Sequence, residues 1–334
     1  MLVTSKAILE ASLEGFKKGK PFAVGAFNVN NMEQMQGIIT AAQETKSPVI
    51  VQVSRGALKY AQDLYLINII KAGAELAPEI PLAIHLDHGN SLETVKRAID
   101  LGFTSVMIDG SLMEDSKTPS TFEYNVKVTS EVVKYAHDRG VSVEGELGTL
   151  GGIEDGVGSG KATLTDPDQA VEFVERTGVD ALAISIGTSH GAFKFKGEPK
   201  LAFDIIEKTR ELLADTYLVS HGSSSVPAEL INAINQYGGQ MEQAQGVPLE
   251  ALQKAITCGM NKINVDTDIR LAATAAVRKL LVEKPSAFDP REYLKMSRQA
   301  IASEVRKRME AFGTVNKIDA VPNWGLEEMK KKYQ

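Results

Sequence analysis

Short apolar segments rich in β-branched residues alternate with amphipathic segments along the whole chain, and this alternation restricts the possible folds more than any other feature. The predicted strands are residues 22–27, 48–53, 81–86, 104–108, 141–146, 179–185, 216–220 and 260–265. Helical patterns fill the gaps at 32–46, 60–77, 92–101, 122–138, 167–177, 201–214, 249–258 and 269–283. Glycines mark several joins between a helix and the next strand, at positions 102, 140, 178 and 259.

Strict alternation implies parallel strands joined by crossover helices. Eight such units predict an α/β protein with a single closed (β/α)8 TIM barrel. The 334 residues exceed the roughly 250 that such a barrel needs. We assign residues 1–312 to one barrel domain, including an additional C-terminal helix at 293–312, and residues 313–334 to an irregular tail of unknown role. No GxGxxG motif follows the first strand, which disfavours an open dinucleotide-binding sheet.

Composition narrows the class of protein. The net charge of −6 argues against nucleic acid or an anionic membrane as the main partner. Cys258 is the single cysteine, so no intrachain disulfide is possible, which suits a reducing compartment. No apolar run approaches 18 residues, and the first residues do not resemble a signal peptide. These features predict a cytoplasmic enzyme.

Three of the five histidines fall at the carboxyl ends of predicted strands, and glycine follows each of them. They are His88, His190 and His221. Active sites of barrel enzymes lie at this end of the strands, and three imidazoles form a familiar catalytic zinc site with one open position. The alternative is that each is a hydrogen-bonded loop residue. We expect His85 in the core or behind the site, and His137 at the surface.

Two further segments predict binding and catalysis. Residues 222–225, Gly-Ser-Ser-Ser, precede a helical run and could cradle a phosphate with backbone N–H groups, aided by Lys194. The glycine-rich segment 148–165 follows the fifth strand and carries Glu154, as expected for an active-site lid with a proton-transfer group. A flexible turn and a surface insertion are the respective alternatives.

Six motifs together resemble those of class II fructose-1,6-bisphosphate aldolases, over nearly the whole chain from Asn28 to Phe312. They are HLDHG at 85–89, EGELG at 144–148, GGIEDG at 151–156, HG at 190–191, HGSS at 221–224 and NVDTD at 264–268. The resemblance implies reversible cleavage of fructose 1,6-bisphosphate to dihydroxyacetone phosphate and glyceraldehyde 3-phosphate, as in glycolysis and gluconeogenesis. It also implies a homodimer or homotetramer.

The resemblance implies a role for individual residues. His88, His190 and His221 would bind Zn²⁺ or another divalent metal, with Glu146 beside it or as an alternative ligand. Asp87 and Glu154 would be the catalytic proton-transfer groups. Backbone carbonyls of Ser189, Gly191 and Gly222 would bind Na⁺ or K⁺. Substrate and phosphate contacts would come from Asn28, Ser54, Gly191, Lys194, Gly222, Ser224, Asn264, Asp266, Thr267 and, from the neighbouring subunit, Arg291.

Several alternatives remain open at this stage. Tagatose 1,6-bisphosphate differs from the fructose compound only at C4. Lys262 shares strand parity with Asn264 and could form a Schiff base inside the barrel. A metallohydrolase and a non-catalytic binding protein would use the same scaffold. Arg55 follows Ser54 where the family usually has a small polar residue, so a phosphate contact there is in doubt.

Overall fold

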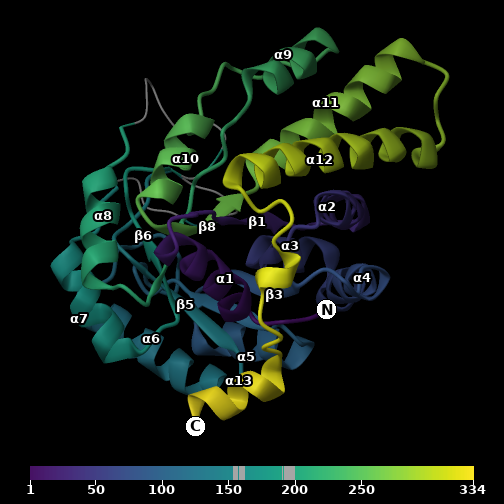
Figure 1. Ribbon diagram of the computed structural model, residues 1–334. Helices are drawn as coiled ribbons and strands as arrows, with labels where there is room; N and C mark the ends of the chain where they lie inside the picture. Colours follow the sequence, from purple (N-terminus) through teal and green to yellow (C-terminus); the bar gives the residue numbers. More distant parts are fainter. Residues whose placement is uncertain (153–156, 158–161, 190, 192–199) are drawn as a thin grey trace.

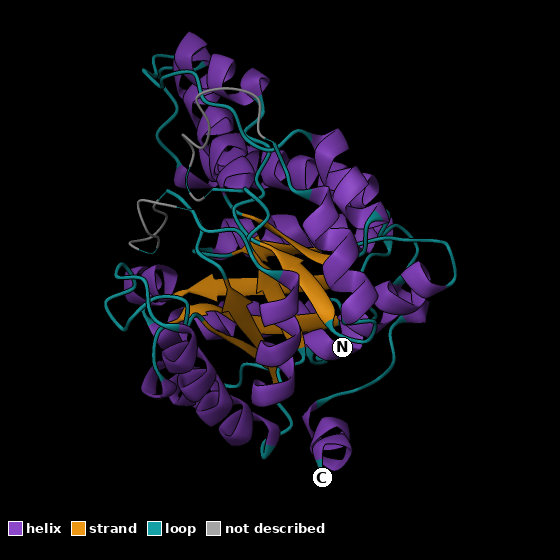
Figure 2. Cartoon of the chain, turned by 90° about the vertical axis from the view of Figure 1, so that its left-hand side faces the viewer, coloured by secondary structure: helices purple, strands orange, loops and turns teal. Residues whose placement is uncertain are grey.

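A computed structural model describes residues 1–152, 157, 162–189, 191 and 200–334. Eight parallel strands close into one barrel in chain order, and helices surround them (Figure 1; Figure 2, strands in orange). The strands are β1 Val24–Asn28, β2 Val49–Ser54, β3 Leu82–Gly89, β4 Ser105–Ile108, β5 Ser142–Leu147, β6 Ala181–Ile184, β7 Tyr217–Ser220 and β8 Met260–Val265. The predicted fold is confirmed, and each strand begins and ends within three residues of its prediction.

Most of the helices that follow the strands also agree with the prediction. They are α2 Met32–Thr45, α3 Arg55–Ala61, α4 Asp63–Leu76, α5 Leu92–Leu101, α6 Phe122–His137, α7 Pro167–Thr177, α8 Phe203–Leu212, α9 Ala228–Gln236, α10 Leu249–Thr257, α11 Thr267–Glu283 and α12 Pro290–Phe312. Side chains cap several N-termini, as Ser91 does for α5. Gly102 and Gly178 end α5 and α7 with positive φ angles, as their positions predict.

Three parts of the helical prediction are wrong. The expected helix at 60–77 is two helices, because Gln62 between α3 and α4 has a φ of 63°. The helix α1, Ser5–Lys17, was not expected. The tail is not irregular, since it forms a 3-10 turn, Ile318–Ala320, and the helix α13, Leu326–Tyr333. Of the helices in the described parts of the chain, none is long and apolar enough to cross a membrane.

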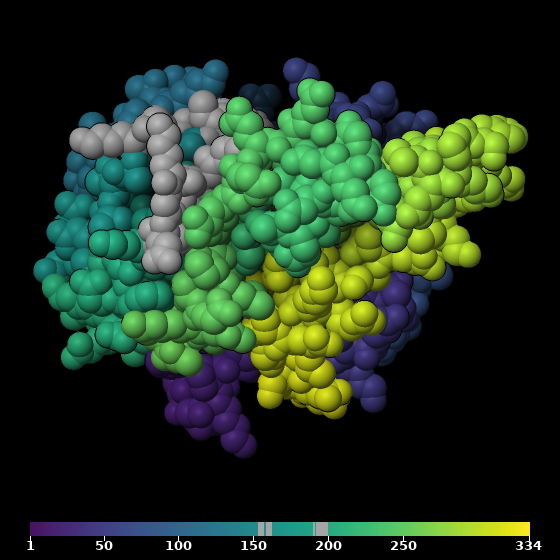
Figure 3. Space-filling view, turned by 90° about the horizontal axis from the view of Figure 1, so that it is seen from above, coloured from purple at the N-terminus to yellow at the C-terminus, as the bar shows by residue number. Residues whose placement is uncertain are grey.

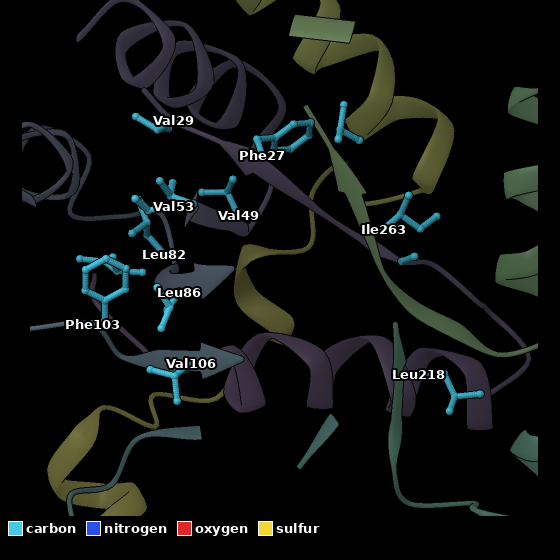
Figure 4. Packing of buried hydrophobic residues seen from close by; sticks show 14 of the residues in the cluster. Phe27, Val29, Val49, Val53, Leu82, Leu86, Phe103, Val106, Leu218 and Ile263 are labelled. Atoms are coloured by element: carbon cyan, nitrogen blue, oxygen red, sulfur yellow. The ribbon is translucent and has the colours of Figure 1, made fainter. Parts of the chain in front are cut away.

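Strand parity divides the barrel residues into two sets. One set faces the surrounding helices, as Val49, Val53, Leu82 and Leu86 do in Figure 4. The other set faces the interior. Near the amino ends of the strands it is apolar, and α1 packs against it to close that end of the barrel. Further along the same strands the inward residues become polar, and they include His85, Asp87, Glu144, Glu146, Lys262 and Asn264.

The tail crosses the closed end of the barrel, where it contacts the residue before α1 and the region around His137 and Asp180 (Figure 1). The backbone N–H of Thr4 donates to the carbonyl of Trp324 at 3.0 Å. The Tyr333 hydroxyl donates to Asp180 Oδ2 at 2.8 Å, and its ring stacks on His137 with 3.6 Å between ring centroids. His137 also bonds to Asp180 at 2.9 Å, and only 18% of its side chain is exposed. The expectation that His137 is a surface residue is therefore wrong.

Docking of the tail can be tested at Gly140, which has a φ of 75° and where an added Cβ would collide with the backbone of Leu326. Gly19 has a similar φ of 69° but has no atom within 4 Å of an added Cβ. Gly19→Ala should cost about 1 kcal/mol of unfolding free energy from backbone strain alone. Gly140→Ala should cost about 1–3 kcal/mol more, because α13 must move. Chemical denaturation of both variants measures this difference, and equal losses would mean that the tail contributes nothing.

Candidate metal centre and active site

One depression at the carboxyl ends of the strands gathers most of the predicted site residues that the structure describes. Strands β1, β2, β3 and β8 and the connection after β7 contribute to it. Its lining includes Asn28, Gln52, Ser54, Arg55, Asp87, His88, Val157, His221, Gly222, Ser223, Ser224, Asn264 and Asp266. The predicted convergence of residues from separate strands is therefore present for this set.

Asp87 and His88 are neighbours in the chain, yet both side chains reach the site. Consecutive strand residues normally point to opposite faces. Here the pairing of β3 with β4 is irregular between Leu86 and Gly89, and His88 has a left-handed φ of 50°. A bulge of this kind re-aims a side chain. As a result His88 Nε2 lies 3.9 Å from Asp87 Oδ1.

His88 and His221 face each other with their ring nitrogens. His221 Nδ1 lies 3.0 Å from His88 Nε2, and the rings are nearly perpendicular. The other nitrogen of each ring bonds to a buried carboxylate, His88 Nδ1 to Asp109 at 3.1 Å and His221 Nε2 to Glu144 at 2.7 Å. Histidines that bind a metal usually carry such a carboxylate, which fixes the tautomer and turns the free nitrogen toward the ion.

Buried negative charge surrounds these two rings. Burial alone would lower the pKa of His88, but Asp87, Asp109 and Glu146 outweigh it and raise the pKa to about 10. Burial, followed by the charge of Asp109, raises the pKa of Glu146 well above its usual range. Asp87 Oδ1 and Glu146 Oε2 are buried without a hydrogen-bond partner among the described residues. A cation would offset this charge and occupy these acceptors.

Two overlapping sets of side chains have the ligand types and spacing to hold a metal ion. One is Asp87, His88 and His221, and the other is His88, Asp109 and Glu146. Zinc binds imidazole nitrogen and carboxylate oxygen at about 2.0–2.2 Å. All candidate ligand atoms within a set lie within 4.8 Å of one another, so one ion could contact each of them. The described residues therefore fit a divalent metal.

Lys262 points into the barrel, as its parity predicts, but it is fully enclosed. Its ammonium donates to Glu144 Oε2 at 2.8 Å, and His85 Nε2 lies 3.3 Å away. Burial and the charge of Lys262 lower the pKa of His85 well below its usual range. A lysine that is paired with a carboxylate and sealed from substrate is poorly placed for Schiff-base formation. It instead balances the charge of the carboxylate behind His221.

The segment 222–226 after β7 is held from several sides. Asp268 is fully buried and accepts the backbone N–H groups of Ser225 and Val226, at 3.0 and 2.8 Å. The Ser224 hydroxyl accepts the N–H groups that open α11, from Asp266 and Thr267. Gly222 has a φ of 60°, and a Cβ there would lie 2.6 Å from the Ser189 carbonyl oxygen. The backbones of residues 189 and 222 therefore lie too close together for a side chain at position 222.

Other predicted residues lie outside the described part of the chain, lie away from the depression, or are engaged by a neighbouring side chain. Glu154, His190 and Lys194 lie outside the described residues. Arg291 does not line the depression, and its side chain is 89% exposed and pairs with Asp289. Gly191 is described but does not line the depression either. Asp266 forms two hydrogen bonds with Arg270 on the next turn of its own helix.

Sequence reasoning gave no role to several residues that shape this site. Asp109 received no role, and Glu144 appeared only as the first residue of the EGELG motif. Gln52 donates to Asn28 Oδ1 at 2.6 Å and lies 3.4 Å from Asp87 Oδ2. Strand parity was the available clue, because Gln52, Glu144 and Lys262 all occupy inward positions where a barrel usually carries apolar residues.

Comparisons with known proteins agree with this geometry. A family model described as "Fructose-bisphosphate aldolase class-II" matches residues 9–317. A fructose-bisphosphate aldolase of Giardia intestinalis is 54% identical and covers 94% of this chain and 95% of the relative. One from Rhizobium meliloti is 47% identical, with coverages of 99% and 95%. Among solved structures, the YdjI aldolase from Escherichia coli K12 is 30% identical with a TM-score of 0.74, covering 94% of this chain and 98% of that one.

The carboxylate behind His221 can be tested with a pair of variants. Glu144→Gln leaves Lys262 as an unpaired buried charge, so it should lose about 3–5 kcal/mol of unfolding free energy. It should also weaken Zn²⁺ binding about 10- to 100-fold, because the orienting charge is gone. Adding Lys262→Met should recover stability without recovering metal affinity. Denaturation and competition with a chelating dye measure the two quantities. Normal affinity in the double variant would show that Glu144 does not orient His221.

Proposed function

The chain belongs to the class-II fructose-bisphosphate aldolase family, and we propose that it cleaves fructose 1,6-bisphosphate at a zinc ion held by His88, His190 and His221. Members of this family are carbon–carbon lyases that depend on a metal and act on sugar bisphosphates. The products would be dihydroxyacetone phosphate and glyceraldehyde 3-phosphate. We assign the reversible reaction to glycolysis and gluconeogenesis in the cytoplasm.

The observation that carries this proposal is the pair of facing imidazoles, each with a carboxylate behind it. When bound, a divalent ion supplies Lewis-acid stabilisation for the negative charge that cleavage leaves on the substrate. Zinc suits imidazole ligands, although other divalent metals share this preference. Glu146 lies 4.0 Å from His221 Nδ1, so it is placed to neighbour the ion or to replace a ligand.

Asp87 is the proposed base for the C4 hydroxyl. Its Oδ2 is held by Asn28 at 3.1 Å, whereas its Oδ1 is buried with no hydrogen-bond partner in the described part of the chain. One oxygen is thus fixed and the other is available to take a proton. Positioned acids and bases contribute about 10²–10⁴ in rate. Because Asp87 also belongs to a possible metal-ligand set, its free oxygen would lie close to the reacting centre.

Glu154 is the proposed group that moves the proton at C3 of dihydroxyacetone phosphate. The segment that carries it begins and ends beside β5, where Thr149 and Thr163 exchange two backbone hydrogen bonds of 3.1 and 2.9 Å. Val157 of the same segment lines the depression. This placement over the site supports a role for the segment in covering the substrate and excluding water.

The phosphate of the dihydroxyacetone half would bind to Gly191, Lys194, Gly222, Ser224 and Thr267. The amides of Ser225 and Val226 are already taken by Asp268. We therefore propose that the earlier amides of this segment, at residues 222–224, face the phosphate. Carbonyls of Ser189, Gly191 and Gly222 would hold a Na⁺ or K⁺ ion. Asn28, Ser54, Asn264 and Asp266 would contact the remaining substrate oxygens.

Arg291 would serve the site of a neighbouring subunit in a homodimer or homotetramer. It opens α12, next to the tip of an arm formed by α11 and α12 that projects from the barrel (Figures 1 and 3). Phe288 at this tip is 89% exposed, as expected for a residue that another copy covers. We propose further that residues 1–312 form the catalytic domain and that 313–334 are the tail that closes its base.

Rival functions are less well supported. Schiff-base chemistry would need Lys262, which is engaged with Glu144. A metallohydrolase would not explain why the segment 222–226 is arranged as the proposed phosphate-binding element. Tagatose 1,6-bisphosphate remains the closest alternative substrate, because it differs from fructose 1,6-bisphosphate at a single carbon.

Replacement of the proposed base gives a direct test. Asp87→Asn keeps the shape of the side chain, and its amide oxygen can still accept the hydrogen bond from Asn28. The amide cannot, however, act as the base that takes the substrate proton. Turnover of fructose 1,6-bisphosphate should fall about 10²–10⁴-fold. Steady-state cleavage assays measure the loss. Arg97→Met is the matched control, because Arg97 is 70% exposed and pairs only with Asp63 among described residues. Wild-type turnover in Asp87→Asn would remove the proposed mechanism.

Metal dependence and substrate choice can be measured in one preparation. Treatment with EDTA should abolish cleavage, and added Zn²⁺ should restore it, because the bound ion is the proposed acceptor of the charge left by bond breaking. Fructose 1,6-bisphosphate should be cleaved with the higher kcat/KM of the two ketose bisphosphates. Full activity in EDTA, with borohydride trapping of substrate on Lys262, would instead favour the Schiff-base enzyme.

A further inference from the structure

Arg55 occupies a particular position between the active site and the neighbouring helices. It is the first residue of α3, directly after Ser54 at the end of β2. It lines the active-site depression and also a second groove, of about 1230 Å³, between α3, α4 and α5. Burial lowers the pKa of its guanidinium, and the charge of Asp109 opposes this. A partly buried guanidinium needs acceptors, so its partners indicate what it does.

The first partner is the backbone of His88. Arg55 Nε donates to the His88 carbonyl oxygen at 3.0 Å. The ladder between β2 and β3 ends at Asp87, and the ladder between β3 and β4 shifts its register between Leu86 and Gly89, so the irregularity falls at His88. Its left-handed φ of 50° is costly for a residue with a Cβ and persists only when the surroundings hold it.

The second partner lies in the connection between β4 and α6. Arg55 Nη2 donates to Ser116 Oγ at 2.6 Å, and Ser116 is buried with a left-handed φ of 58°. Asp115 braces this turn by accepting the N–H groups of Lys117 and Thr118, both at 2.8 Å. Arg55 therefore links the ends of β2 and β3 to a hydrogen-bonded turn after β4. Both of the residues that it contacts, His88 and Ser116, have left-handed backbones.

We propose that Arg55 is a positioning residue that locks the bulge at His88, so that Asp87 and His88 point into the site together. The proposal rests on the roles proposed above for these two residues. Without the lock, the strand can relax toward regular pairing, which turns consecutive side chains to opposite faces. Two of the three guanidinium nitrogens, Nε and Nη2, already donate to neutral acceptors. Arg55 is therefore poorly placed to bind a substrate phosphate through bidentate hydrogen bonds.

The experiment compares Arg55→Met, Arg55→Lys and Ser116→Ala with the control Arg97→Met. Each protein is stripped with a chelator, and its affinity for Zn²⁺ is measured by competition with a chelating dye. After reloading, kcat and KM for fructose 1,6-bisphosphate are determined, and binding of inorganic phosphate is measured by calorimetry. Asp87→Asn and His88→Ala are assayed in parallel, so that failure of the proposed function is seen separately.

Arg55→Met should weaken Zn²⁺ binding and lower kcat, each about 10- to 100-fold, while KM and phosphate affinity stay within about threefold. Arg55→Lys should recover part of both losses, because an ammonium can reach one of the two acceptors. Ser116→Ala should show a smaller loss of the same kind, and Arg97→Met none. If Arg55→Met does not fold, Arg55→Lys and Ser116→Ala decide the question.

Two results would overturn the proposal. A raised KM and weaker phosphate binding, with unchanged kcat and Zn²⁺ affinity, would make Arg55 a phosphate ligand. A lowered melting temperature with every binding and kinetic constant unchanged would make it a purely structural residue. If Asp87→Asn and His88→Ala lose activity while Arg55→Met does not, the positioning role alone is refuted.

Discussion

Concentrated negative charge inside the barrel is the constraint on which the rest of this structure depends. Asp87, Asp109, Glu144 and Glu146 are all buried around two imidazoles. Such groups are costly to bury unless cations or protons balance them. Lys262 balances Glu144 directly. Against the effect of burial, the neighbouring carboxylates raise the pKa of His88, and burial together with the charge of Asp109 raises the pKa of Glu146. A divalent ion is the natural counter-charge for this arrangement, and metal dependence is general in this family.

The barrel provides this arrangement through strand parity and one exception to it. Inward positions change from apolar near α1 to polar at the carboxyl ends, so the same strands supply both a core and a site. The exception is the bulge at His88, which brings two consecutive residues to the same point. Asp109 and Glu144 then fix the ring orientations of His88 and His221. Arg55 holds the backbone of His88 through its carbonyl oxygen.

Much of the fold could be predicted because each strand and helix carries its own local pattern. The eightfold alternation predicted the closed barrel, strand ends predicted the positions of His88 and His221, and the family resemblance pointed to Asp87. What could not be predicted depends on contacts distant in sequence. The Glu144–Lys262 pair joins β5 to β8, and Tyr333 meets Asp180 across 153 positions. The helix α13 was missed because its stability comes from packing on the barrel rather than from its own short sequence.

Anomalous diffraction at the zinc absorption edge, from crystals of the zinc-loaded protein, tests the central claim most directly. The account predicts one strong peak per subunit, about 2.0–2.1 Å from His88 Nε2 and His221 Nδ1. The position of His190 in the same map would settle the third ligand. A peak bound elsewhere, with these two imidazoles still hydrogen-bonded to each other in protein that cleaves substrate, would contradict the account.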